Sequence, residues 1–76
     1  MEQQIRQVMA DILDLVPDSI DESTSRDNTA TWDSLSQINI LVALEQEFNV
    51  SFDPEEVELM MSFADILEIV EKKVAA

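Results

Sequence analysis

The fold of this chain is decided by residues 33–49, which read DSLSQINILVALEQEFN. Asp33 is a residue type that caps helix N-termini, and Asn49 tolerates the left-handed conformation in which helices often end. Ser34 and Gln37 offer an alternative capping box one residue later. The residues between these signals include neither glycine nor proline. The stretch therefore predicts a helix over residues 34–48.

This predicted helix has two apolar faces. At about 100° per residue, Leu35, Ile38 and Val42 form a set that spans about 60° and is centred about 140° from the other apolar set. A small bundle needs only one buried stripe on each helix, so the second set is surplus. Two interpretations stay open: a central helix buried on both sides, or an exposed second face that docks a partner. The set expected in the core is Ile40, Leu41, Leu44 and Phe48.

A first helix and a long loop precede this segment. Residues 2–15 carry apolar side chains at helical spacing, and Pro17 ends that helix. Residues 17–32 are rich in serine, threonine, aspartate and asparagine, which favour turns. We expect a short helical turn over residues 17–20, with Ile20 pointing inward. Loops of this length in a compact domain are usually functional or disordered.

Two helices follow it. Asp53, Pro54 and Glu55 form a helix start and predict a short helix over about residues 54–60. A second capping signal opens a last helix over about residues 63–74. The predicted fold is therefore all-α, a small four-helix bundle of three main helices and one short one, in a single domain over residues 1–76. The side chains expected to face inward from the last two helices are Val57, Met60, Phe63, Ile66, Leu67, Val70 and Val74.

The composition excludes several classes of function. Seventeen acidic and four basic residues give a net charge of −13, so we expect no nucleic-acid or anionic-membrane partner. The chain has neither cysteine nor histidine, which removes the usual thiol nucleophile, general base and zinc ligands. An EF-hand starting at Asp27 fails, because Trp32 stands where glycine is required and Ile38 where glutamate is required. We therefore predict no catalytic residue and no metal site.

Two further expectations come from the apolar runs and from the charge. No apolar run is long enough for a spanning helix, and the start of the chain does not resemble a signal peptide. We therefore expect a soluble, cytoplasmic monomer. Ten acids and no lysine or arginine lie within residues 33–71, alongside the surplus apolar set. This pattern favours docking to basic partner proteins, although an acidic surface kept for solubility is the alternative.

Ser34 places a hydroxyl at the start of the predicted second helix. The unpaired N–H groups of a helix N-terminus suit a phosphate group. Without histidine, the chain has no base to make Ser34 a nucleophile. The spacing alone leaves two roles open, a helix cap and a site that another enzyme modifies.

The sequence resembles the acyl carrier protein family along nearly its whole length. The resemblance rests on D-S-L at residues 33–35 joined to A-L-E-Q-E-F at residues 43–48, with S-F at residues 62–63 opening the last helix. D-S-L alone is a weak signal. Its combination with A-L-E-Q-E-F at this distance, in an acidic chain of this length, is specific.

The resemblance implies a carrier protein and not an enzyme. In the family, the D-S-L serine, here Ser34, receives 4′-phosphopantetheine from coenzyme A through a phosphopantetheinyl transferase, which makes the chain a phosphoprotein. The thiol of the arm holds acyl or aminoacyl intermediates as thioesters, for example in fatty acid or polyketide biosynthesis. Ligase or synthase enzymes load these intermediates onto the arm. The alternative is an unmodified acidic domain that docks basic partners through its second helix. The positions that match the family's partner surface are Asp33, Leu35, Ile38, Val42, Glu45 and Glu47.

Departures from the family pattern indicate a specialised carrier and not a housekeeping one. Ser36 and Asn39 occupy positions that are often acidic in fatty-acid carriers, and Thr31 replaces a common glycine. Trp32 either packs in the core or guides the arm. The resemblance also implies candidates that would line a pocket for an acyl chain, namely Leu41, Leu44, Phe52, Met60 and Ile66.

Overall fold

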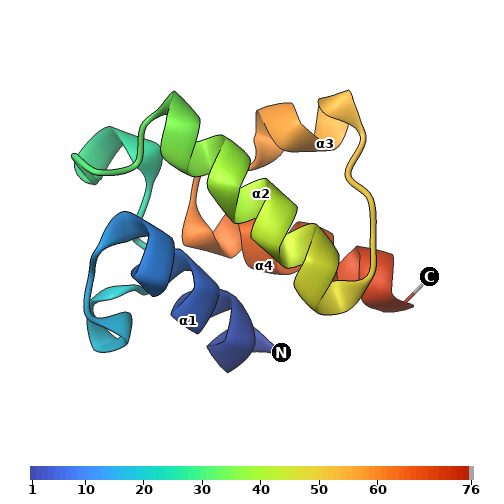
Figure 1. The fold of residues 1–76 in the computed structure, drawn as a ribbon, viewed down its shortest axis with the longest axis horizontal. Helices are drawn as coiled ribbons and strands as arrows, with labels where there is room; N and C mark the ends of the chain where they lie inside the picture. The colour runs from blue at the N-terminus through green and yellow to red at the C-terminus, as the bar shows by residue number, and fades with distance from the viewer. Residues whose placement is uncertain (76) are drawn as a thin grey trace.

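The computed structural model describes residues 1–75, and within them it confirms the predicted all-α bundle. Figure 1 shows α2 crossing the molecule between α1 and α3, with α4 behind it. Two short 3-10 helices lie in the long connection before α2, at Pro17–Ser19 and Arg26–Asn28. The four α-helices of the described chain are α1 (Glu2–Leu13), α2 (Ser34–Phe48), α3 (Pro54–Leu59) and α4 (Phe63–Ala75).

The bounds of α2 are those predicted. Asp33 is its N-cap, and the carboxylate accepts the Ser36 N–H at 2.9 Å. Asn49 ends the helix with a φ of 55°, in the left-handed region that asparagine tolerates. The alternative capping box is not formed, because the Gln37 side chain turns into the core instead.

The core lies between α1, α2 and α4, with Met60 added from the segment that follows α3. Each main helix contributes buried residues at helical spacing, and burial of this apolar surface is the main driving force for folding. Ile20, from the long connection, is also buried, as predicted. The side chains with no exposed surface are Ile5, Met9, Leu13, Ile40, Leu44, Met60, Ile66 and Val70.

Val74 corrects one prediction about α4. The periodicity places it on the inward stripe, but its side chain is 43% exposed. The last core residue of α4 is Val70, and the following turn extends past the bundle. There Lys73 turns toward α3 instead, and its Nζ lies 2.8 Å from Glu56 Oε1. Val57 and Leu67 are half-buried.

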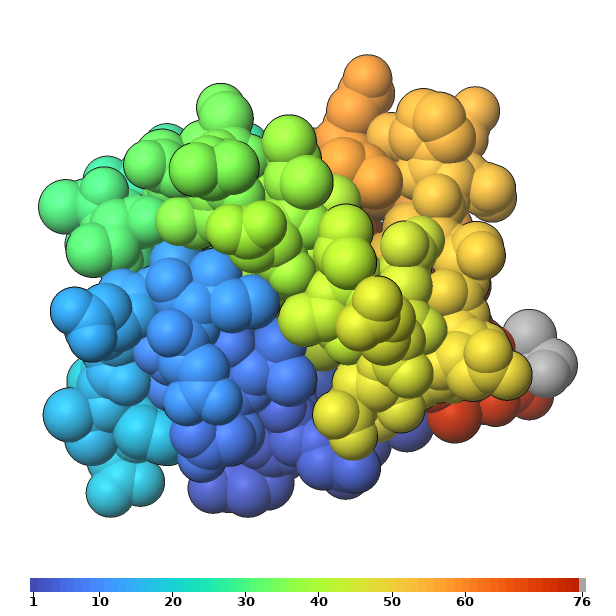
Figure 2. Space-filling view, in the orientation of Figure 1, coloured from blue at the N-terminus to red at the C-terminus, as the bar shows by residue number. Residues whose placement is uncertain are grey.

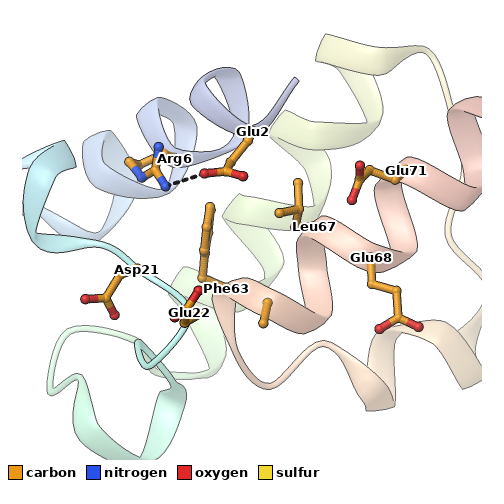
Figure 3. A pocket seen from close by; sticks show the side chains of 9 residues that line it. Glu2, Arg6, Asp21, Glu22, Phe63, Leu67, Glu68 and Glu71 are labelled. Atoms are coloured by element: carbon orange, nitrogen blue, oxygen red, sulfur yellow. Dashed lines mark hydrogen bonds and ion pairs between the residues drawn. The ribbon is translucent and has the colours of Figure 1, made fainter.

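The long connection between α1 and α2 is held by specific contacts. Ser25 pairs with Ser62 in an isolated β-bridge, and the Phe63 N–H donates to the Thr24 carbonyl at 2.9 Å. Arg6 of α1 donates from Nε to the Ile20 carbonyl at 2.9 Å, and its guanidinium lies 5.0 Å from the centre of the Phe63 ring (Figure 3). The connection is therefore an ordered part of the fold.

Within residues 1–75, none of the helices combines the length and the apolar character needed to cross a membrane.

Candidate functional site

Ser34 is the first residue of α2, and its side chain is exposed. Its hydroxyl makes no hydrogen bond to any residue of the described chain. The neighbouring Ser36 differs, because its Oγ donates to the Thr31 carbonyl at 2.8 Å. Of the two serines in the first turn of α2, Ser34 is thus the one with an exposed side chain and no internal hydrogen bond.

The Asp33 carboxylate fixes the start of α2 beside this hydroxyl. The Ser36 backbone N–H that it accepts lowers the pKa of Asp33 below its ordinary value. Asp33 is therefore an anion at neutral pH and a weak base. It is suited to hold the helix start and to add negative charge to the surface, and not to activate Ser34.

A buried hydrogen-bond chain holds the segment that precedes Ser34. Trp32 is 3% exposed, and its Nε1 donates to Gln37 Oε1 at 2.6 Å. Gln37, itself 5% exposed, donates from Nε2 to the Met60 carbonyl at 3.1 Å. This burial confirms the core-packing interpretation of Trp32. The contacts tie the start of α2 to the segment between α3 and α4.

Sequence reasoning missed the role of Gln37. A signal for it was present, because a buried indole needs a hydrogen-bond acceptor and Gln37 lies five residues after Trp32. Its position three residues after Ser34 instead indicates an alternative cap, a role typical of glutamine at that spacing.

The second apolar face of α2 is exposed, which rules out the interpretation in which this helix is buried on both sides. Leu35 is 68% exposed, Ile38 57% and Val42 47%. Figure 2 shows the side chains of α2, coloured green to yellow, at the surface between those of α1 and α3. We call Leu35, Ile38 and Val42 the apolar strip.

The two acids near the end of α2 have different surroundings. Glu47 is exposed. Glu45 is half-buried, and its Oε2 accepts the Phe52 N–H at 2.9 Å, so this carboxylate also holds the turn after α2. Glu47 is therefore the freer of the two for a partner.

The five side chains proposed to line an acyl pocket lie in or beside the core. Leu44, Met60 and Ile66 have no exposed surface, whereas Leu41 and Phe52 are half-buried and pack against the core. These residues are therefore close-packed, and their lining of an acyl pocket stays a prediction.

Known proteins match the chain over almost its entire length. A family model described as "Phosphopantetheine attachment site" matches residues 3–72. The acyl carrier protein of Thermosynechococcus vestitus is 31% identical over 74 residues, which cover 97% of this chain and 91% of that protein. The chain belongs to the acyl carrier protein family. The carrier of Buchnera aphidicola is 30% identical over 74 residues, or 97% of this chain and 95% of its own.

A solved structure supports the same fold for this carrier. The solution structure of a holo acyl carrier protein from Geobacter metallireducens superposes with a TM-score of 0.86 at 26% identity, covering 97% of this chain and 85% of that one. Membership of the family means that the chain is a carrier without catalytic activity of its own. When attached, 4′-phosphopantetheine supplies the thiol on which acyl groups are held as thioesters. A phosphopantetheinyl transferase and biosynthetic enzymes are the partners that the family implies.

Proposed function

We propose that Ser34 is the attachment site of 4′-phosphopantetheine. The observation that carries the proposal is the exposed Ser34 hydroxyl, free of internal hydrogen bonds, at the N-terminus of α2. Ser36, two residues later, has its hydroxyl bound to the Thr31 carbonyl. The D-S-L motif of the family places its serine at the same position.

The attachment reaction would proceed on the transferase, with this chain as acceptor. Ser34 Oγ forms a bond to the phosphorus of the phosphopantetheinyl group of coenzyme A. The bond from that phosphorus to the adenosine bisphosphate part breaks, and the hydroxyl proton passes to a base of the transferase. The chain contributes the exposed hydroxyl and the helix N-terminus, whose dipole favours the resulting phosphodiester. Since the chain has no cysteine, the thiol of the arm would be its only thiol.

The proposed partner surface is the apolar strip together with Asp33, Glu45 and Glu47. Its exposed apolar area would be buried in an apolar groove of the partner, and its acids would face basic residues there. The absence of lysine and arginine from residues 33–71 supports a basic partner. The same negative charge opposes self-association, which favours a monomer.

The charge of α2 supports a specialised carrier with its own ligase or synthase. Residues 34–44 contain no charged side chain, so acids flank the apolar strip only at Asp33 and at Glu45 and Glu47. An enzyme whose basic residues bind acids in the middle of α2 would find no acidic side chain there in this chain. We propose that the enzyme that loads an acyl or aminoacyl group recognises the apolar strip and the acids at the two ends of α2.

The experiment that tests Ser34 is intact mass measurement after incubation with coenzyme A, Mg²⁺ and a broad-specificity transferase. We expect the wild-type chain to gain one arm, Ser34→Ala to gain none, and the matched control Ser36→Ala to gain one. Circular dichroism should show all three folded, because Asp33 and not Ser34 caps α2. Loading of Ser34→Ala, or an unmodified but folded wild-type chain, would refute the proposal.

A further inference from the structure

A cleft of about 350 Å³ opens in the long connection between α1 and α2. Polar but uncharged side chains dominate its lining, and Leu15 and Ala30 add apolar surface. None of the lining residues is ionisable, in a chain whose net charge is −13. The polar lining residues are Ser19, Ser23, Thr24, Asn28, Thr29 and Thr31.

Two other clefts of the described chain are acidic. The cleft in Figure 3 brings together five carboxylates, with Arg6 bound to one of them, Glu2, at 2.8 Å. The cleft between the end of α3 and α4 is bordered by three acids, Glu58, Asp65 and Glu68, and by Lys72, which is bound to Glu68 at 2.9 Å. Its apolar lining includes Leu59 and Met61. Carboxylates are strongly hydrated. Desolvating them under a neutral ligand therefore costs more free energy than desolvating hydroxyl and amide groups.

The uncharged cleft lies close to Ser34 along the chain. Thr31 lines it and precedes Ser34 by three residues, which span at most about 11 Å of extended chain. The hydrogen bond from Ser36 Oγ to the Thr31 carbonyl, at 2.8 Å, draws the two segments together. A phosphopantetheine arm contains two amides in a long chain of single bonds, and it reaches farther than this separation.

The cleft retains hydrogen-bonding capacity for such an arm. Thr29 Oγ1 donates to Asn28 Oδ1 at 3.0 Å, and so keeps its lone pairs for an external N–H. The Thr31 hydroxyl makes no hydrogen bond to any residue between 1 and 75, and so offers a donor to a carbonyl. Leu15 and Ala30 present apolar surface for the methyl groups of the arm.

We propose that this cleft is the resting site of the phosphopantetheine arm, with the arm amides bonded to the Thr29 and Thr31 hydroxyls. The inference rests on the proposed attachment at Ser34. The ligand is the tethered, uncharged part of the arm beyond its phosphodiester. In this position the arm lies against the connection and leaves the apolar strip of α2 free for a partner.

The test is isotope-filtered nuclear Overhauser spectroscopy on the holo protein. The chain is labelled with ¹³C and ¹⁵N, and the arm is transferred from unlabelled coenzyme A. We expect contacts from the geminal methyl protons of the arm to the methyl groups of Thr29, Ala30 and Thr31. Contacts only to Leu59, Met61 or the apolar strip, or none beyond Ser34 and Leu35, would overturn the resting site.

A matched pair of variants sharpens the test. Ala30→Phe fills the uncharged cleft, whereas Ala64→Phe makes the same change in the acidic cleft of Figure 3. We expect Ala30→Phe to lose the arm contacts and Ala64→Phe to keep them. Equal contacts in both variants would overturn the proposal. Intact mass distinguishes failure of the resting site from failure of attachment at Ser34. A chain that carries the arm but lacks these contacts refutes only the resting site. A wild-type chain that does not gain the arm refutes attachment at Ser34 as well.

Discussion

The two apolar faces of α2 have similar side chains but opposite environments. Ile40 and Leu44 have no exposed surface, whereas Leu35 and Ile38 are 68% and 57% exposed. The difference follows from where α1 and α4 pack, and not from residue type. One face therefore supplies stability to the bundle, and the other is the exposed face that we propose for a partner. Each face should respond to a different measurement.

The largest expected effect is on the buried face. Leu44→Ala should lower the free energy of unfolding by about 2 to 5 kcal/mol, because it leaves a cavity in the core. The matched change Leu35→Ala should alter it by less than about 0.5 kcal/mol, since the side chain is exposed. Urea denaturation followed by circular dichroism measures both. Equal losses would remove the distinction between the faces.

The next effect concerns the apolar strip. Val42→Asp puts a charge where a partner would bury a methyl group, and it should weaken binding to the phosphopantetheinyl transferase at least about tenfold. The stability of the chain should stay nearly unchanged, because Val42 is 47% exposed. Titration calorimetry with the transferase provides the affinity. Unchanged affinity would show that the strip is not the docking surface.

A smaller effect is expected at the end of α2. Glu47→Lys should slow association with a basic partner several-fold at low salt and much less at high salt, because salt screens exposed charges. Glu71→Lys makes the same change of charge on α4 and is the control. Glu45 is a poorer choice, since its carboxylate also accepts the Phe52 N–H. Stopped-flow measurements give the association rates. Equal rates for Glu47→Lys and Glu71→Lys would contradict electrostatic steering by the end of α2.

The smallest effect concerns the first turn of α2. Asparagine caps helices as aspartate does, so Asp33→Asn removes the charge and keeps the cap. The lowered pKa of Asp33 means that its charge stabilises the fold above the unfolded-state pKa, near 4, and that this contribution is lost as the pH falls through the folded-state pKa. Wild type should be slightly more stable than the variant at pH 7, and the two should converge only as the pH falls through the lowered folded-state pKa of Asp33. A pH series of urea denaturation curves tests this, and a constant difference would contradict it.

The sequence predicted the helices well and the long connection only in part, since it indicated the helical turn at Pro17–Ser19 and the burial of Ile20 but not the contacts made by the rest of the connection. Helix caps and apolar spacing are local signals, and they placed the bounds of α2 at Ser34 and Phe48. The pairing of Ser25 with Ser62 joins residues far apart in the chain, and no local signal encodes it. Gln37 was misassigned for a similar reason, because its partners are the Trp32 indole and the Met60 carbonyl.

The candidate site was only partly predictable. The apolar strip is exposed because α1 and α4 pack against the other face of α2. Apolar periodicity along α2 does not show which face those helices cover, so it did not predict whether the strip is exposed. The tie between Glu45 and the Phe52 N–H also depends on how the turn after α2 closes. The proposal of Ser34, by contrast, rests on sequence motifs, namely D-S-L at residues 33–35 together with A-L-E-Q-E-F at residues 43–48.

The central claim is that this chain serves as a tether through one hydroxyl. The most direct measurement is fragmentation mass spectrometry of the protein isolated from its own cells. The account predicts a phosphopantetheine arm, free or acylated, on the peptide that contains Ser34, with the fragment ions placing it on that residue. An arm on Ser36 or elsewhere, or a Ser34 that is unmodified in every molecule, would contradict it.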